Sequence, residues 1–503
     1  MNSLLKSLLL LSLFAVTGLA APAAKPEPRP ELLPIQDAPG LPRVLLIGDT
    51  VSIGYTLPVR KRLEGKANVH RVLRNCGPSQ LGAESVAEWL GPEPWDVVHF
   101  NFGASDLMLG KDGEPVVTPE RYAVNLRIIV NKIRAHSPRA RLVFATTTPV
   151  PETLGNSQIH FAVKDADACA AAARKVMDDA GVRVNDLHAL VMPRLKELQI
   201  PGNIHFRAPG WDLMGEQTAK EIAAALKDPP PAVAPVAKGE GLRVFTCGHS
   251  FHVWVVPLLS EMAFFAGITD HVVAGRSSIG GSTVMKHWDV PEEKNLAKQA
   301  LRAGKVDVLT LSPIWLPEEG IEKFAALAFE HNKSVRVTVQ EYWLPNDEYN
   351  PVYPLDTRKK VDHNATTIPA LRKAQDQYDH DIDEHCRGIN KKLGKKVIVT
   401  VPCGQAVLAL REKIIAGEVP ALKTQTELFR DNWGHPTVPV QVLAAYCHFA
   451  VIYRRTPLGL PLPTAFAKNP AWDEKLNRLL QELAWDAVTK HPLSGMQAKA
   501  GTK

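Results

Sequence analysis

The sequence predicts two α/β domains in tandem, each with a parallel sheet covered by helices on both faces. First, the chain runs twice through the same order of apolar strand segments and helical segments. Second, these strand segments are continuously apolar, as in sheets that are buried on both sides. Third, a proline-rich stretch at residues 228–241 separates the two runs. Such a stretch is typical of a semi-rigid linker between domains.

Length and composition agree with this organisation. The chain has 503 residues, 45% of them hydrophobic and 22% charged, as in ordinary globular proteins with two or three domains. The formal net charge of +6 is spread along the chain without a basic run, so we expect no nucleic-acid partner. Six cysteines show no paired spacing, which leaves both buried thiols and disulfides open.

Residues 1–20 have the pattern of a secretory signal peptide. Lys6 precedes a largely apolar run at residues 8–16, and small residues surround a cleavage point after Ala20. The apolar run is shorter than the roughly 20 residues that cross a bilayer. We therefore expect cleavage, a secreted or periplasmic protein, and no membrane span in the mature chain.

The remaining segments follow in order. After a proline-rich segment at residues 21–41, we place the first domain at residues 42–227 and the second at residues 242–465. The paired strands are residues 43–48 and 243–248, 95–100 and 306–311, 141–146 and 335–340, and 182–184 and 397–401. Helices at about residues 166–180 and 368–393 precede the last strand of each domain. Residues 346–367 predict an inserted loop near the second site, and residues 466–503 a C-terminal helix and tail.

Ser250 and His435 are the candidate nucleophile and base of the second domain. Ser250 follows the first strand, where the amides that begin the next helix can stabilise an oxyanion. His435 lies on the last loop of the same sheet edge and can accept the serine proton, with Asp431 as the candidate orienting carboxylate. A Gly-x-Ser turn is also common turn chemistry, but its occurrence together with a late histidine favours catalysis.

These residues resemble those of the SGNH (GDSL-type) hydrolase family, and the resemblance covers both halves of the chain. Members of that family are flavodoxin-like, three-layer α/β/α esterases, lipases and carbohydrate deacetylases. Their motifs are Gly-Asp-Ser after the first strand, a second motif with an oxyanion glycine, Gly-x-Asn-Asp, and a final Asp-x-x-His. The resemblance therefore implies two tandem flavodoxin-like domains.

The first domain is similar to this pattern in four places. They are Gly48-Asp49-Thr50, Asn75-Cys76-Gly77-Pro78, Gly103-Ala104-Ser105-Asp106 and Ile204-His205-Phe206. The resemblance thus implies, as equivalents of the family's site residues, Thr50, Gly77, Gly103, Ser105 and His205.

Three departures reduce the activity that we expect of this domain. The extra methyl of Thr50 restricts the rotamer that attack requires. Ser105 stands where the family has asparagine, and Gly202 where it has the aspartate. Asp186 is either a substitute carboxylate or a helix cap. We therefore expect that the first domain does not hydrolyse esters efficiently. Instead, we expect it to bind a ligand or to hold the remnant of an active site.

The second domain departs from the family elsewhere. Gly248-His249-Ser250 resembles the first motif, and residues 278–282 the second, which implies Gly281 or Gly280 as the oxyanion glycine. Residues 311–314 lack the asparagine of the third motif. Asp431 is one residue too far from His435 for Asp-x-x-His, a register in which Asn432 falls. Either Asp431 or Asn432 can therefore be the residue that orients His435.

Other side chains compete for a functional interpretation. Residues 376–386 hold the pairs His380 with Glu384 and Asp381 with His385, each one helical turn apart. A solvated helix face explains such a run better, so we assign no metal. Near the site, substrate binding and core packing both remain open for His249, His252, His287, Trp254, Trp288, Trp315 and Trp343.

These observations lead to one functional expectation and two alternatives. We expect a secreted SGNH-type serine esterase, a carboxylic ester hydrolase that needs no cofactor and acts on an acylated carbohydrate or a small ester. Ser250 attacks the ester, and its amide with that of Gly281 holds the oxyanion. The first alternative is a non-catalytic carbohydrate-binding or cell-envelope scaffold with degenerate SGNH domains. The second is a metal-dependent hydrolase that uses the His380 cluster.

Overall fold

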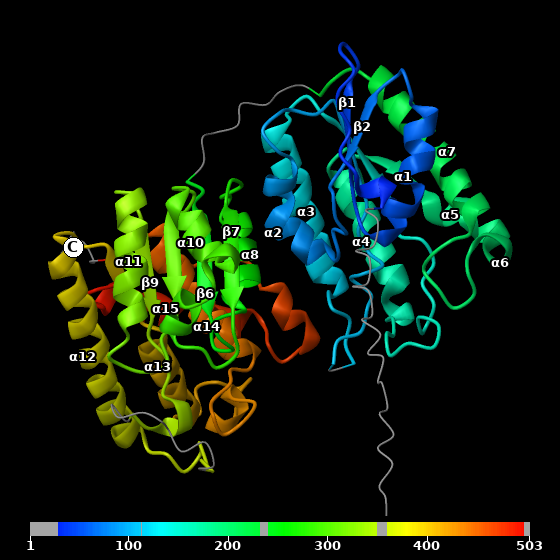
Figure 1. The fold of residues 1–503 in the computed structure, drawn as a ribbon. Helices are drawn as coiled ribbons and strands as arrows, with labels where there is room; N and C mark the ends of the chain where they lie inside the picture. The colour runs from blue at the N-terminus through cyan, green and yellow to red at the C-terminus, as the bar shows by residue number, and fades with distance from the viewer. Residues whose placement is uncertain (1–28, 112, 232–239, 350–359, 497–503) are drawn as a thin grey trace, which may run out of the picture.

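The computed structural model describes residues 29–111, 113–231, 240–349 and 360–496 (Figure 1). The predicted signal peptide lies outside these residues, as does the middle of the predicted linker, residues 232–239. Within the described ranges, no helix combines the length and the apolar character needed to cross a bilayer.

The first domain contains a five-stranded parallel sheet in the order β2-β1-β3-β4-β5. Its strands are β1 (Arg43–Ile47), β2 (Asn68–Arg71), β3 (Val97–Phe100), β4 (Arg141–Ala145) and β5 (Arg183–Asn185). Its helices are α1 (Thr50–Arg62), α2 (Ser79–Trp89), α3 (Pro119–His136), α4 (Ala166–Asp179), α5 (Leu187–Val191), α6 (Leu195–Leu198) and α7 (Ala208–Lys227).

The second domain repeats this topology. Its strands are β6 (Arg243–Gly248), β7 (Val272–Ser278), β8 (Val308–Leu311), β9 (Arg336–Gln340) and β10 (Ile398–Val401). The parallel order β7-β6-β8-β9-β10 matches the first sheet strand for strand. The helices are α8 (Val255–Phe265), α9 (Val284–Trp288), α10 (Leu296–Arg302), α11 (Glu319–His331), α12 (Ile368–Leu393), α13 (Cys403–Ile415), α14 (Val438–Tyr453) and α15 (Glu474–Lys490). The predicted fold class is confirmed.

The apolar strands are explained by burial on both faces of each sheet. In β1, Val44 and Leu46 join one hydrophobic cluster, whereas Leu45 and Ile47 join the cluster on the opposite face. Successive side chains of a strand point to opposite faces, so both sets must be apolar. Because the strands are parallel, their carboxyl ends meet at one edge of each sheet, where ligands bind in such folds.

The edge strands β2 and β7 were not predicted. Both lie at the outer edge of their sheets, and β7 carries Arg276, Ser277 and Ser278 with mostly partial or full exposure. Its pairing with β6 also shifts register between Val244 and Phe245. A strand with one unpaired edge does not require the continuous apolar run that reveals the central strands.

The two domains contact each other directly through α2 and α3 of the first and α8 and β7 of the second (Figure 1). Arg121 Nη1 of α3 lies 2.6 Å from Glu261 Oε2 of α8. Phe264 and Phe265, at the end of α8, pack against the hydrophobic cluster of the first domain. Apolar contact and a shielded ion pair therefore join the domains.

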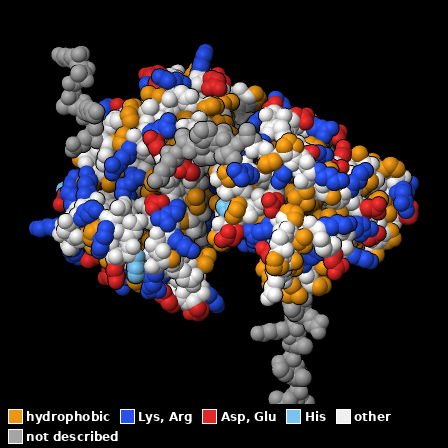
Figure 2. Space-filling view, turned by 90° about the horizontal axis from the view of Figure 1, so that it is seen from above, with side chains coloured by type: hydrophobic (Ala, Val, Ile, Leu, Met, Phe, Trp, Pro, Cys, Tyr) orange, Lys and Arg blue, Asp and Glu red, His pale blue; other side chains and the backbone are white. Residues whose placement is uncertain are grey.

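All six cysteines are buried and free. Of the two possibilities that their spacing left open, the structure thus has buried thiols. On the surface, Lys and Arg side chains are interspersed with Asp and Glu over the face seen in Figure 2. The excess of basic residues is not gathered into a single tract on this face.

Candidate active site

Ser250 and His435 meet at the carboxyl edge of the second sheet, although 185 positions separate them in the sequence. The distance from Ser250 Oγ to His435 Nε2 is 2.8 Å. Ser250 lies in a turn after β6, closed by the amides of His252 and Val253, which both donate to the carbonyl of His249. Helix α8 begins only at Val255. The serine is therefore held in a turn rather than in the first turn of a helix.

Asp431 is the carboxylate that contacts the imidazole. Its Oδ2 lies 2.7 Å from His435 Nδ1, and its Oδ1 accepts hydrogen bonds from the amides of Trp433 at 3.0 Å and His435 at 3.1 Å. Partial burial raises the pKa of Asp431, but the hydrogen bonds and the charge of His435 outweigh this effect and hold it below its ordinary value. Asn432 is exposed. Of the two residues that the sequence left open, Asp431 is the one in contact.

Aromatic side chains support the histidine loop. The ring of Phe251 meets that of His435 edge-on with centroids 4.9 Å apart, and it stacks on Trp343 at 5.3 Å. Trp343 Nε1 donates a hydrogen bond to the carbonyl of Gly434 at 2.7 Å. Gly434 has a φ of +83°, a conformation that a side chain would strain. Trp343 therefore serves as buried support for this loop.

His363 contacts the same loop from its other side. Its Nε2 lies 3.3 Å from the carbonyl oxygen of Asp431, and its Nδ1 lies 3.0 Å from Asp347 Oδ2. Arg411 donates two hydrogen bonds to Asp347, at 2.6 and 2.9 Å. Burial alone would raise the pKa of Asp347, but Arg411 and His363 lower it well below its ordinary value. The described ends of the predicted insertion at residues 346–367 therefore lie beside the site.

A cavity of about 350 Å³ opens at Ser250. Its lining residues are His249, Ser250, Phe251, Gly281, Pro313, Ile314, Tyr342, Pro345, Trp433 and His435. None of these carries a carboxylate, an ammonium or a guanidinium group. Gly281 lines the cavity and Gly280 does not, so the geometry favours Gly281 as the oxyanion glycine. Within the described ranges, the amides of Ser250 and Gly281 donate no hydrogen bond.

His249 is a packed neutral histidine rather than an exposed ligand. Burial lowers its pKa to about 4. Its Nδ1 accepts the amide proton of Phe251 at 3.3 Å, and its Nε2 lies 3.2 Å from Ser312 Oγ. His252 and His287 are likewise buried. At the end of β8, Pro313 and Ile314 line the cavity in place of an asparagine amide.

The first domain lacks the corresponding arrangement. Thr50 begins α1, and the described residues contain no hydrogen bond between its hydroxyl and His205. Burial lowers the pKa of His205, and its ring lies 6.4 Å from that of Trp211. The amide of Gly77 already donates to Asn75 Oδ1 at 2.9 Å. Among the described residues, this domain therefore lacks the contact between nucleophile and base, and the amide of Gly77 is already occupied.

Two further equivalents in the first domain have structural settings. Gly103 has a φ of +144°, and a Cβ there would lie 1.8 Å from Thr147 Oγ1, so only glycine fits. Ser105 lies in the turn after β3, next to Asp106, whose Oδ1 accepts a hydrogen bond from the Ser79 amide at 2.9 Å. Burial raises the pKa of Asp106 to about 7. The hydrogen bonds between Asp106 and Ser79 connect this turn to α2.

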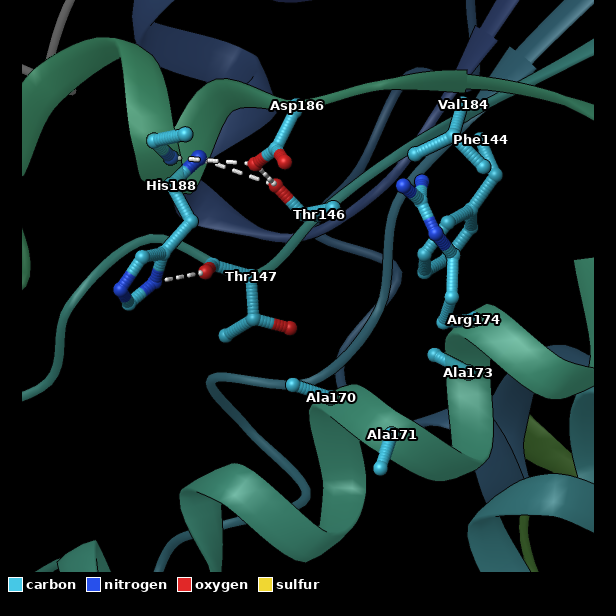
Figure 3. A pocket seen from close by; sticks show the side chains of 11 residues that line it. Phe144, Thr146, Thr147, Ala170, Ala171, Ala173, Arg174, Val184, Asp186 and His188 are labelled. Atoms are coloured by element: carbon cyan, nitrogen blue, oxygen red, sulfur yellow. Dashed lines mark hydrogen bonds between the residues drawn. The ribbon is translucent and has the colours of Figure 1, made fainter.

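A separate cavity of about 340 Å³ in the first domain lies between α4 and the ends of β4 and β5 (Figure 3). Asp186 lines it, and its Oδ1 accepts hydrogen bonds from Thr146 Oγ1 and from the Ala189 amide, both at 3.0 Å. Asp186 is therefore the cap of α5 and not a partner of His205. Neither Thr50 nor His205 lines this cavity.

The ligand pairs proposed for residues 376–386 do not converge. His380 and Glu384 are exposed on α12, Asp381 accepts a hydrogen bond from Tyr349, and His385 Nε2 lies 3.1 Å from the carbonyl of Glu318. Among the described residues, neither pair belongs to a group of three or more side chains that could hold a metal.

Comparison with solved structures finds distant likenesses. A lipase/acylhydrolase from Enterococcus faecalis is 18% identical, with 38% of this chain and 100% of that chain covered and a TM-score of 0.32. A carbohydrate esterase family 3 protein from Talaromyces cellulolyticus is 15% identical, with 37% and 99% covered and a TM-score of 0.30. A DUF4886 family protein from Bacteroides uniformis is 15% identical, with 50% and 95% covered and a TM-score of 0.32.

Comparison with families gives a defined match, whereas no curated protein matches the chain. Residues 58–213 match the GDSL-like Lipase/Acylhydrolase family. The match lies in the first domain and begins after Gly48-Asp49-Thr50. The second domain repeats the same strand order. The family assignment to the GDSL-like lipase/acylhydrolase (SGNH) proteins is therefore that of residues 58–213.

Proposed function

We propose that the second domain is a carboxylic ester hydrolase that works through an acyl-enzyme on Ser250. The observation that carries this proposal is the continuous contact from Ser250 Oγ to His435 Nε2, at 2.8 Å, and from His435 Nδ1 to Asp431 Oδ2, at 2.7 Å. A hydroxyl, an imidazole and a carboxylate in this order are the requirement for serine acyl transfer.

In the proposed reaction, Ser250 Oγ attacks the ester carbonyl carbon while its proton passes to His435 Nε2. The carbon–oxygen bond to the alcohol then breaks, and the imidazolium returns the proton to the departing oxygen. Water repeats the sequence on the acyl-enzyme and releases the acid. The amides of Ser250 and Gly281, which have no partner within the described residues, stabilise the oxyanion in both halves of the reaction.

The cavity supports an uncharged acyl group as the substrate moiety. Its walls include Phe251, Ile314 and Tyr342, and no charged side chain lines it. Trp433, at the rim, is 36% exposed and offers a flat apolar face. We propose an acylated carbohydrate or a small neutral ester as the substrate. The leader pattern at residues 1–20 supports a substrate outside the cytoplasm.

A fluorophosphonate probe tests the proposal directly. We expect one covalent adduct, which peptide mass spectrometry locates on Ser250, because only an activated hydroxyl attacks this electrophile quickly. Thr50 provides an internal control and is expected to stay unmodified. A protein that is not labelled and does not hydrolyse p-nitrophenyl acetate would instead favour the non-catalytic scaffold.

Replacing Asp431 by asparagine is expected to lower kcat by about 100-fold, because the imidazole loses both its charge partner and its tautomer control. The loss is smaller than for a buried carboxylate, since the Asp431 side chain is 43% exposed and water screens its charge. Because the pKa of Asp431 is lowered, it stays ionised where His435 must be neutral to act as a base. The measurement is kcat against pH.

The matched control is Asn432→Ala, which alters the exposed neighbour of Asp431. It is expected to keep the wild-type kcat and pH profile. Equal losses in the two variants would show that the loop, and not the carboxylate, is what matters.

A further inference from the structure

Three ligand-type side chains from distant segments converge beside β10, outside the contact of Ser250, His435 and Asp431. They are Glu341, directly after β9, Asp383, on the inner face of α12, and His491, directly after α15. One donor atom of each lies within 4.8 Å of the donor atoms of the other two. Their exposed fractions are 0%, 6% and 4%. A carboxylate, a second carboxylate and an imidazole thus share one enclosed point.

Glu341 is paired with His491 but accepts no aligned hydrogen bond from the described residues. Both of its carboxylate oxygens are buried, and neither accepts a hydrogen bond from a described residue. Oε1 lies 2.8 Å from His491 Nε2 without the alignment of a hydrogen bond. A buried carboxylate without donors is costly unless a cation compensates its charge. Within this cluster, Glu341 and Asp383 share the single imidazole of His491, at 2.8 and 3.7 Å, so a divalent cation there would compensate the second carboxylate.

The surroundings of His491 resemble a second coordination shell. Nδ1 lies 3.1 Å from Thr400 Oγ1 of β10, which can accept its proton when Nε2 binds a metal. In this structure the amide of Leu493 donates a hydrogen bond to Nδ1 at 3.2 Å, so metal binding at Nε2 requires this bond to be replaced by one from Nδ1 to Thr400 Oγ1. The amide of Thr400 donates to the carbonyl of Leu493 at 3.2 Å, which holds this segment against the sheet.

We propose that Glu341, Asp383 and His491 bind one Zn²⁺ ion as a structural site. One imidazole nitrogen and two carboxylate oxygens are a ligand set that zinc accepts, and Mn²⁺ would bind the same donors more weakly. The all-oxygen preference of Ca²⁺ and Mg²⁺ disfavours these ions. This site lies outside the Ser250 triad and makes no part of the ester chemistry.

Bound zinc would fasten the segment after α15 to the sheet beside the candidate active site. His491 belongs to the C-terminal segment, Glu341 directly follows β9, and Asp383 lies on α12, so one ion would connect these three elements. The next residue after Glu341 is Tyr342, which lines the cavity at Ser250. The ion would thus stabilise the wall of the cavity from behind.

The test uses the full chain, depleted of metal by a chelator and then titrated with Zn²⁺ by calorimetry, with metal content measured by elemental mass spectrometry. We expect one Zn²⁺ per chain and a higher thermal unfolding midpoint with zinc. Glu341→Gln and His491→Gln are each expected to weaken zinc binding by roughly 100-fold. Asp383→Asn is a further test if either variant fails to fold.

The controls are His380→Gln and Glu384→Gln, which alter exposed ligand-type residues of the same helix. Both should bind zinc as the wild type does. Absence of saturable zinc binding by the wild type would overturn the proposal. Unchanged affinity in Glu341→Gln and His491→Gln, or a loss that follows His380 instead, would overturn it as well.

Discussion

Replacing Ser250 by alanine is expected to lower kcat for p-nitrophenyl ester hydrolysis by about 10³-fold or more, because the attacking oxygen is removed. The remaining rate would come from binding and from the oxyanion amides alone. The measurement is the initial rate at saturating ester, with wild type and variant compared at the same enzyme concentration. Because Ser250 Oγ forms a hydrogen bond only with His435 Nε2 within the part of the chain that the structure describes, little stability should be lost.

Two observations separate this result from damage to the fold. The thermal unfolding midpoint of Ser250→Ala should match that of the wild type. Thr50→Ala, which alters the equivalent position of the first domain, should retain full activity. A Ser250→Ala protein with the wild-type rate, or loss of the rate in Thr50→Ala, would refute the assignment of the nucleophile to the second domain.

Replacing Glu261 by alanine is expected to lower the free energy of unfolding by about 3–5 kcal/mol, the usual loss when a buried charge loses its partner. The Glu261 side chain is 1% exposed and that of Arg121 is 12% exposed, at a distance of 2.6 Å. Glu261 Oε1 also accepts the amide proton of Thr464 at 2.9 Å. The substitution therefore leaves a guanidinium at the domain interface without its carboxylate. Urea unfolding curves give the measurement.

Lys490→Ala serves as the matched control, because it removes an exposed ion pair to Asp486 on the surface of α15. Exposed pairs contribute about 0–1 kcal/mol, so this variant should unfold almost as the wild type does. The double variant Arg121→Ala with Glu261→Ala should be more stable than the sum of the single losses predicts. Equal losses for Glu261→Ala and Lys490→Ala would contradict a shielded pair between the domains.

The central strands of both sheets were predictable because they are buried on two sides. A residue such as Leu45 faces one core and its neighbour Leu46 faces the other, which leaves a continuous apolar run in the sequence. The edge strands β2 and β7 leave no such run. Their position follows from pairing with β1 and β6, which only the folded chain displays.

The contact between Ser250 and His435 followed from topology, because the first and last elements of such a domain share one sheet edge. The choice between Asp431 and Asn432 did not follow, since it depends on the path of a loop closed by Gly434. The contacts of His363 with Asp347 and with the loop of Asp431 could not be predicted from the sequence, because they form only in the folded chain.

The inward-facing carboxylate Asp383 of α12 did leave a sequence signal. Tyr378 and Ile382, both 0% exposed, mark the inner face of the helix, and Asp379 and Asp383 lie one position after each. Helical periodicity thus places Asp383 on the inner face of α12 and His380 and Glu384 on the outer face.

The spacing between Asp431 and His435 has a consequence for how such proteins are detected. The additional residue is accommodated because the amides of Trp433 and His435 both turn back onto the same carboxylate, so the loop closes on itself. The contact between the carboxylate and the imidazole therefore forms even with one more residue between them in the sequence. A sequence search that requires a fixed spacing between the aspartate and the histidine would miss domains of this kind. It would detect only an adjacent domain whose motifs are closer to the family pattern.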